Sequence, residues 1–261
     1  MTEFNYESKW WGYIYDQMML EDLPEVLEDH RRFYYSNLKD VHGPVLECAC
    51  GTGLFFLPLL SSGCDIYGFD ISKSMLATLN SKAAAGWFQD LSGRISVQDF
   101  ESFHYDQRFE AIIIPSNAFA HLTTQAAQIK TLRNIFDHLA PSGRLLMDLR
   151  LVGMRGLVED PPVVEGSWHI WTHPQTGRPI RQRVNGRYDF ERRLTLDLCT
   201  IEYDGQTEEF PMTGRWIIKD EFQLLLRVAG FQRWECFGTP DRGPLHTGLE
   251  DAHSYWIAYK T

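Results

Sequence analysis

The sequence lacks a long apolar run, an excess of positive charge and more than a few cysteines. Its 261 residues contain no apolar stretch of about 18 residues, and no basic segment followed by an apolar one opens the chain. We therefore expect neither a membrane span nor secretion. Lys and Arg number 25 against 35 Asp and Glu, which gives a net charge of −10. This balance disfavours a nucleic-acid partner, because such partners usually require a basic patch.

Cysteines are too few and too scattered for a disulfide framework or a zinc site. The five cysteines are Cys48, Cys50, Cys64, Cys199 and Cys236. Their number is odd, and none is paired with histidine at metal-site spacing. We therefore expect free thiols and a cytoplasmic location.

Two common nucleotide-binding motifs are absent, and their absence narrows the identity of the glycine-rich segment that is present. The apolar segment 45–49 suits a buried parallel strand, which Gly51 and Gly53 end before an apolar helical segment begins. A dinucleotide fingerprint needs a third glycine where Phe56 stands, and no P-loop occurs. A second apolar run ends in Asp70, the place where nucleotide folds bind ribose hydroxyls.

The glycine segment, Glu47-x-Ala49-x-Gly51-x-Gly53, resembles motif I of the class I S-adenosylmethionine-dependent methyltransferases, with Ala49 in place of the first glycine. The resemblance covers roughly 40–150 and 219–261. It implies an α/β fold with a Rossmann-like, seven-stranded, mostly parallel sheet whose last strand is antiparallel, and S-adenosylmethionine as cofactor. The implied cofactor-binding residues are Glu47, Ala49, Gly51, Gly53, Asp70, Ile71, Met75, Asp99, Phe100 and Pro115. Asp99 would bind adenine, or else it is a strand-end residue that faces solvent.

Alternating strands and helices support this fold from residue 44 onward. The pattern predicts strands at 44–48, 65–69, 94–98, 109–114, 143–149, 231–237 and 254–259. It predicts helices at 53–62, 73–85, 124–139 and 219–229, with Ser72 as an N-cap and Gly230 as a helix end.

Two regions lie outside the resemblance, although residues 1–261 read as a single domain. Residues 1–40 predict a helical, aromatic cap that either covers the active site or simply packs on the sheet. Residues 160–218 predict an inserted antiparallel lobe of three or four strands over the active site. Its middle turn lies at Asn185-Gly186 or at 189–192. An arginine cluster in the lobe could bind an acidic substrate, but a solvated sheet face is the favoured interpretation.

The segment after the fourth strand indicates the methyl acceptor. No acid occurs in 111–122, which argues against a metal, and the Asn/Asp-Pro-Pro-aromatic motif of enzymes that methylate nucleic-acid amines is missing. Ser116 through Leu122 is similar to the Ser-x-x-x-His-Leu stretch of amino-sugar N,N-dimethyltransferases, and the chain also resembles glycine N-methyltransferase-like enzymes. The resemblance makes His121 a candidate general base, with a structural role as the alternative, and we name Tyr6 as a second candidate catalytic residue.

Further polar and aromatic side chains are candidates for binding the acceptor. They are Tyr13, Asn117, Asp148, Arg150, Arg215, Trp216 and His246. Asp148 and Arg150 end the fifth strand, where a local ion pair between them is the favoured alternative to substrate binding.

The sequence thus predicts an enzyme that transfers a methyl group to a nitrogen or oxygen of a small molecule. One alternative is a non-catalytic S-adenosylmethionine-binding protein. The other is a nucleotide-dependent oxidoreductase on the same fold, which Phe56 disfavours. We expect no nucleic-acid, membrane or metal partner, and a homodimer remains open.

Overall fold

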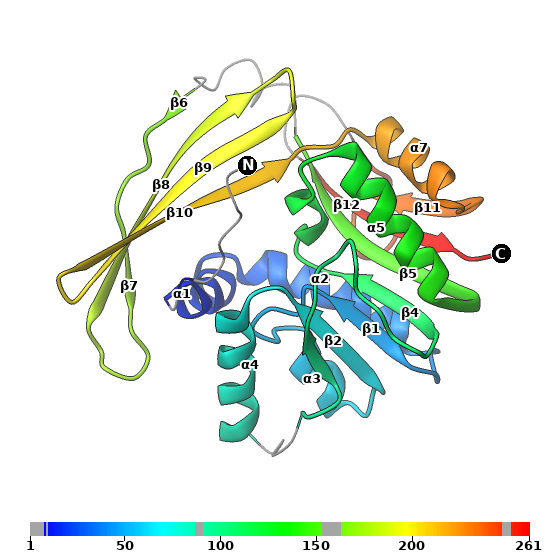
Figure 1. The fold of residues 1–261 in the computed structure, drawn as a ribbon, viewed down its shortest axis with the longest axis horizontal. Helices are drawn as coiled ribbons and strands as arrows, with labels where there is room; N and C mark the ends of the chain where they lie inside the picture. The colour runs from blue at the N-terminus through cyan, green and yellow to red at the C-terminus, as the bar shows by residue number, and fades with distance from the viewer. Residues whose placement is uncertain (1–7, 9, 87–90, 153–162, 247–251) are drawn as a thin grey trace.

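The computed structural model describes residues 8, 10–86, 91–152, 163–246 and 252–261, and it contains two sheets (Figure 1). The larger sheet has seven strands in the order β11-β12-β5-β4-β1-β2-β3. β12 is antiparallel to both of its neighbours, β5 and β11, whereas β1 to β5 are parallel. The predicted fold class is confirmed. The strands are β1 (Val45–Cys48), β2 (Ile66–Asp70), β3 (Ile95–Val97), β4 (Phe109–Ile114), β5 (Leu139–Leu151), β11 (Arg233–Phe237) and β12 (Ala252–Tyr259).

Helices cover both faces of this sheet because its strands are apolar on both sides. In β4, Ile112 and Ile114 pack with α5 (Gln125–His138) and α7 (Lys219–Ala229). Ala111 and Ile113 face the other way. That second face carries α2 (Pro24–Leu38), α3 (Phe56–Ser61) and α4 (Lys73–Ala85).

Helix ends follow the sequence signals. The Ser72 hydroxyl accepts the main-chain N–H of Met75 at the start of α4, so the predicted N-cap is confirmed. Gly230 ends α7 with a φ of 118°, a left-handed conformation that glycine adopts without strain. No helix in the described part of the chain is long and apolar enough to cross a membrane.

The N-terminal segment forms α1 (Trp11–Gln17), a π-helical turn η1 (Met18–Asp22) and α2, which begins at Pro24. α1 lies against α4 and the glycine turn. A Cβ on Gly12 would stand 2.7 Å from Thr78 Oγ1 and 3.5 Å from Thr52 Cγ2, so a larger residue would require Thr78 or α1 to shift. Asp16 joins the same elements: it accepts a hydrogen bond from Thr52 Oγ1 at 2.5 Å and one from Lys82 Nζ at 2.8 Å.

The smaller sheet is inserted between β5 and α7 and has five strands, one or two more than the sequence predicts. They are β6 (Val163–Val164), β7 (His169–Thr172), β8 (Pro179–Asp189), β9 (Leu194–Tyr203) and β10 (Gln206–Arg215). Their order is β10-β9-β8-β6, and β7 also pairs with β8. The middle turn follows Asp189, whereas Asn185 and Gly186 lie inside β8.

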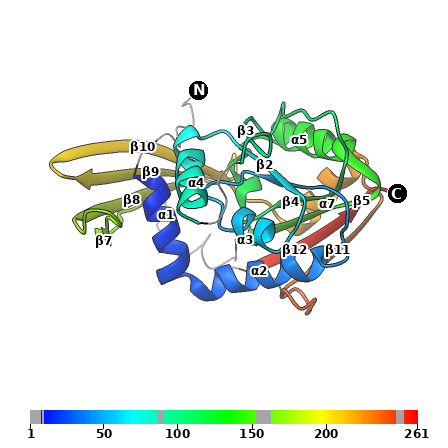
Figure 2. The ribbon, with the colours of Figure 1, turned by 90° about the horizontal axis from the view of Figure 1, so that it is seen from below.

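α1 also carries the inserted sheet (Figures 1 and 2). Trp11 and Ile14 pack in one apolar cluster with Cys199 and Phe210 of the sheet. The Gln17 amide donates to the carbonyl of Thr172 at 2.7 Å. The helix therefore lies between the inserted sheet and the glycine turn.

Candidate functional site

The turn after β1 is shaped to let backbone approach a ligand. Ala49, Gly51 and Gly53 have φ values of 58°, 52° and 82°. A Cβ on Gly51 would stand 3.3 Å from Met75 Cε, a tight contact, and would lie on a left-handed backbone that strains any residue with a side chain. The left-handed conformation costs alanine roughly 1–2 kcal/mol, which explains why the resemblance expects glycine at position 49.

Asp70 ends β2 and points back toward this turn. Its Oδ2 accepts the main-chain N–H of Gly51 at 2.8 Å, and its Oδ1 accepts that of Ser72 at 2.8 Å. The residue is 8% exposed. A carboxylate has about four acceptor sites, so Asp70 can also accept hydrogen bonds from ribose hydroxyls.

Glu47 has an unsatisfied oxygen beneath the same turn. Its Oε2 is buried without a hydrogen-bond partner in the part of the chain that the structure describes. Burial raises the pKa of this carboxyl well above its usual range, and the charge of Asp70 raises it further. A positively charged ligand would compensate for both effects, so the site fits a cofactor that carries sulfonium and ammonium groups.

Arg31 is a residue that sequence reasoning missed. Its Nη2 donates to the carbonyl of Leu54, just after the glycine turn, at 3.1 Å. Its Nε is buried and has no hydrogen-bond partner among the described residues. Nothing in the local sequence distinguishes Arg31 from its neighbour Arg32, because α2 reaches the turn through tertiary packing alone.

The other predicted cofactor residues, both apolar and polar, lie along the same edge of the sheet. Ile71 is 54% exposed although it adjoins the buried Asp70, and Met75 packs beneath Gly51. Asp99 Oδ1 accepts the main-chain N–H of Glu101 at 2.7 Å, and the Phe100 ring meets that of Phe69 edge-on. The structure thus brings the predicted cofactor residues of β1, β2 and β3 to one edge.

The loop after β4 is held from below by Asp148. Ser116 and Asn117, which follow Pro115, both have left-handed backbones, with φ values of 57° and 56°. Their N–H groups donate to Asp148 Oδ1 and Oδ2 at 2.8 and 2.7 Å. The Tyr34 hydroxyl also donates to Asp148, at 2.6 Å. The structure therefore places Asp148 fully buried under the loop, rather than exposed to an acceptor or paired with Arg150.

His121 lies in the short 3₁₀ helix η2 (Ala118–His121) that follows this loop. Its Nδ1 is 3.2 Å from the carbonyl oxygen of Thr213 in the inserted sheet. Because a carbonyl can only accept, Nδ1 carries the proton and Nε2 has the lone pair. Desolvation lowers the pKa of the imidazole below its usual value, against the opposing effect of the Thr213 hydrogen bond. The ring is therefore mostly neutral at pH 7.

Tyr15 of α1 reaches the same loop and was not predicted as an individual site residue. Burial raises the pKa of its hydroxyl to about 12, the neighbouring Ser116 opposes this, and the charge of Asp148 adds to it. The dense aromatic pattern of the first residues was its only signal in the sequence.

The other candidate acceptor residues are dispersed. Tyr13 packs on His173 of the inserted sheet, and His246 is exposed. Arg150 is exposed at the end of β5, while Trp216 has a buried Nε1 with no hydrogen-bond partner within the described ranges. Tyr6 lies outside the described residues.

Arg215 belongs to a buried ion network rather than to the carboxyl edge. It pairs with Glu221 of α7 at 2.7 Å and donates to Gln128 of α5 at 3.1 Å. Arg193 also pairs with Glu221, at 2.7 Å. The network attaches the inserted sheet to the two helices.

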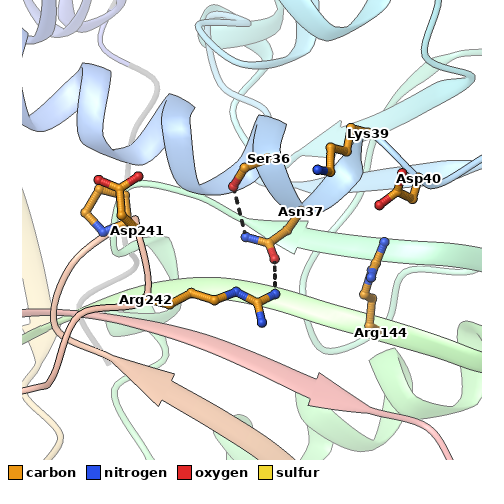
Figure 3. A pocket seen from close by; sticks show the side chains of 8 residues that line it. Ser36, Asn37, Lys39, Asp40, Arg144, Asp241 and Arg242 are labelled. Atoms are coloured by element: carbon orange, nitrogen blue, oxygen red, sulfur yellow. Dashed lines mark hydrogen bonds between the residues drawn. The ribbon is translucent and has the colours of Figure 1, made fainter.

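A hollow of about 470 Å³ lies at the opposite end of the large sheet. Figure 3 shows Arg144 and Arg242 on one side of it and the end of α2 on the other, with Arg242 donating to Asn37 Oδ1 at 2.8 Å. Arg144 of β5 is the strand-register partner of Ala111, near the start of β4. Sheets of this type bind ligands at the carboxyl ends of their strands, so this hollow is not the nucleotide site.

Within the described residues, no group of three His, Cys, Asp or Glu side chains is placed to bind a metal ion. The candidate site consists of the glycine turn, the acidic residues Glu47, Asp70 and Asp99 along the carboxyl edge, the loop on Asp148, and His121.

Comparison with known proteins gives a consistent result. Residues 45–143 match the family described as "Methyltransferase domain". A glycine/sarcosine N-methyltransferase of Halorhodospira halochloris is 33% identical over 205 residues, which span 74% of this chain and 67% of that protein. A cypemycin N-terminal methyltransferase of Streptomyces sp is 25% identical over 191 residues, 72% of each chain. The structure of the CcbJ methyltransferase from Streptomyces caelestis shares the fold, with a TM-score of 0.72 and 21% identity over 89% of this chain and 90% of that one.

Proposed function

The chain belongs to the class I S-adenosylmethionine-dependent methyltransferases, and on this premise we propose that it methylates a nitrogen of a small molecule, with an oxygen acceptor as the alternative. Of the two sequence relatives described above, one is named an N-methyltransferase and the other an N-terminal methyltransferase. A neutral His121 near the expected methyl position also suits an amine, which attacks only through a free lone pair.

The position of α1 and the inserted sheet beside the carboxyl edge is the observation that carries the small-molecule assignment. α1 contacts the glycine turn at Gly12, and the inserted sheet packs on α1 through Trp11 and Phe210. A folded protein or nucleic acid would need free access to this edge, and α1 with the inserted sheet packed on it takes up part of that space.

We propose that Asp70 binds the cofactor ribose and that Ile71 and Asp99 contact its adenine. Glu47 compensates the positive charge of the bound cofactor. Arg31 pairs with its carboxylate, because the buried Nε lacks a hydrogen bond that such an anion would supply.

The cofactor supplies a methyl group on a positively charged sulfur. The chain has to align the acceptor with that methyl group, and such alignment lowers the barrier by roughly 7–11 kcal/mol. Asp148 positions the Ser116–Asn117 loop against which the acceptor lies. His121 Nε2 accepts the proton that an amine loses, which accounts for roughly 10²–10⁴-fold in rate.

The test is a methyl-transfer assay that follows S-adenosylhomocysteine release. Glycine, sarcosine, trialanine and glucosamine sample the amine classes, and catechol samples a hydroxyl acceptor. Turnover of an amine supports N-methylation, and turnover of catechol alone supports the alternative. Cofactor binding without any methyl transfer would contradict an enzymatic role.

A further inference from the structure

Asp197 lies on the face of the inserted sheet that is directed toward α1. Side chains two apart in a strand share one face and are about 7 Å apart along it. Asp197 therefore lies on the same face of β9 as Cys199 and Ile201, which pack with Trp11 and Ile14 of α1. Beyond these contacts Asp197 places a single carboxylate on the same face.

The opposite strand leaves space for this carboxylate. Gly186 is the register partner of Asp197, and a Cβ there would stand 2.5 Å from Asp197 Oδ1. Gly186 does not have a positive φ, so the backbone itself does not require glycine. The small residue is needed because the carboxylate lies across it.

The surroundings of Asp197 are those of the proposed acceptor site. Leu196, its neighbour in β9, pairs with Thr213, whose carbonyl contacts His121. Arg150, at the carboxyl end of β5, is close enough for its charge to act on the Asp197 carboxyl. Asp197 therefore lies between α1 on one side and the His121 and Arg150 segments on the other.

The carboxylate is half-buried yet unused by the fold. No hydrogen bond to it occurs within the described residues. Burial raises the pKa of the carboxyl, and the charge of Arg150 opposes that change. A shielded carboxylate without hydrogen bonds is costly unless it meets a cationic or hydrogen-donating partner.

We propose that Asp197 is a catalytic residue that faces the acceptor nitrogen and stabilises the positive charge that develops there during methyl transfer. This inference rests on the proposed function. The nitrogen lone pair forms the new N–C bond while the C–S electron pair stays with sulfur, so one positive charge moves from sulfur to nitrogen. The proton that the amine loses passes to His121 Nε2, as in the proposed function. A fixed carboxylate beside that nitrogen is worth most where water is scarce.

The experiment uses the full chain and whichever of glycine, sarcosine, trialanine or glucosamine is turned over. Asp197→Asn keeps the shape and removes the charge, and Asp197→Glu restores it. The matched control is Glu209→Gln on β10 of the same sheet, an exposed carboxylate. We expect kcat to fall about a hundredfold in Asp197→Asn, with the Kd of S-adenosylmethionine unchanged, partial recovery in Asp197→Glu and no loss in the control.

Gly186→Ala provides an independent variant that moves the carboxylate without removing it. Its loss of kcat should be large in the wild-type background and small in Asp197→Asn, because coupled residues are not additive. A loss of less than about threefold in folded Asp197→Asn, far below the size of such electrostatic effects, would overturn the inference. An equal loss in Glu209→Gln, or full additivity with Gly186→Ala, would also overturn it. Turnover of the amine in the wild type keeps the proposed function intact in each of these cases.

Discussion

The Asp148 carboxylate accepts the main-chain N–H of Asn117 at 2.7 Å, although the two residues are 31 positions apart. The contact is reinforced by the main chain of Arg150, which donates to Asn117 Oδ1 at 3.0 Å. β5 thereby fixes a loop whose two left-handed residues would be strained without it.

Asp148→Asn should destabilise the protein. The substitution turns one acceptor oxygen into a donor that faces a main-chain N–H, and losing a hydrogen bond to a charged group costs about 1.5–3 kcal/mol. Urea unfolding measures the change. Asp204→Asn, which breaks an exposed ion pair with Arg178, is the control and should cost less than about 1 kcal/mol. Equal stability of the two variants would show that the loop does not depend on Asp148.

Asp70→Ala should weaken S-adenosylmethionine binding by about 1.5–3 kcal/mol, the range for hydrogen bonds to a charged group. Calorimetry on the folded variant measures this. Asp65→Asn, on an exposed residue just before β2 that pairs with Arg94, should bind as the wild type does. If Asp70→Ala retained full affinity, the ribose would have to lie elsewhere.

His121→Ala should lower kcat by about 10²-fold or more and leave cofactor affinity nearly unchanged. The lowered pKa of the imidazole means that the base is lost only when the pH falls below its ordinary value of about 6.5. The acid limb of the kcat profile should therefore lie below that pH and should disappear in the variant. A folded variant that keeps more than roughly a tenth of kcat falls short of a base and assigns His121 a structural role.

Glu221→Gln should destabilise the junction between the inserted sheet and the core. Removing one partner of a buried ion pair costs about 3–5 kcal/mol, and Glu221 is 8% exposed beside the 5%-exposed Arg215. Thermal unfolding at pH 7 measures the loss. Glu101→Gln, which affects a long and exposed contact with Lys130, is the control.

The stability loss in Glu221→Gln should depend on pH. Burial alone would raise the pKa of Glu221, but hydrogen bonds from Arg215 and Gln125 and the nearby arginine charges lower it. The stabilisation is therefore complete above the unfolded value of about 4.3 and is lost as the pH falls through the lower folded value. The stability difference between wild type and Glu221→Gln should narrow in acid. A constant difference would exclude titration of Glu221 as the cause.

Local signals predicted the framework closely. The predicted helix at 73–85 coincides with α4, because Ser72 caps it and Gly86 follows it. The strand at 109–114 coincides with β4, since an apolar run buried on both faces ends at a proline.

Elsewhere the local patterns misplaced residues, because these residues are positioned by partners that are distant in the sequence. Asn185-Gly186 carries a strong turn signal, yet it lies within β8 because Gly186 makes room for Asp197. Arg215 was expected near the acceptor, but the acid that determines its position is on α7, in a different layer. Asp148 was weighed against its neighbour Arg150, whereas its partners are main-chain groups of a distant loop. These pairings arise from tertiary packing, which no local pattern encodes.

Gly12 is a position at which one added methyl group would disturb two neighbouring parts of the fold. Gly12 approaches Thr78 of α4 and Thr52 of the glycine turn, while its neighbour Trp11 packs on the inserted sheet through Phe210. An alanine at position 12 would require Thr78 or α1 to shift, and a shift of α1 would move the inserted sheet that packs on it. Gly12 therefore couples the position of the glycine turn and α4 to that of the inserted sheet, which are the two parts of the fold to which we assign the cofactor and the acceptor.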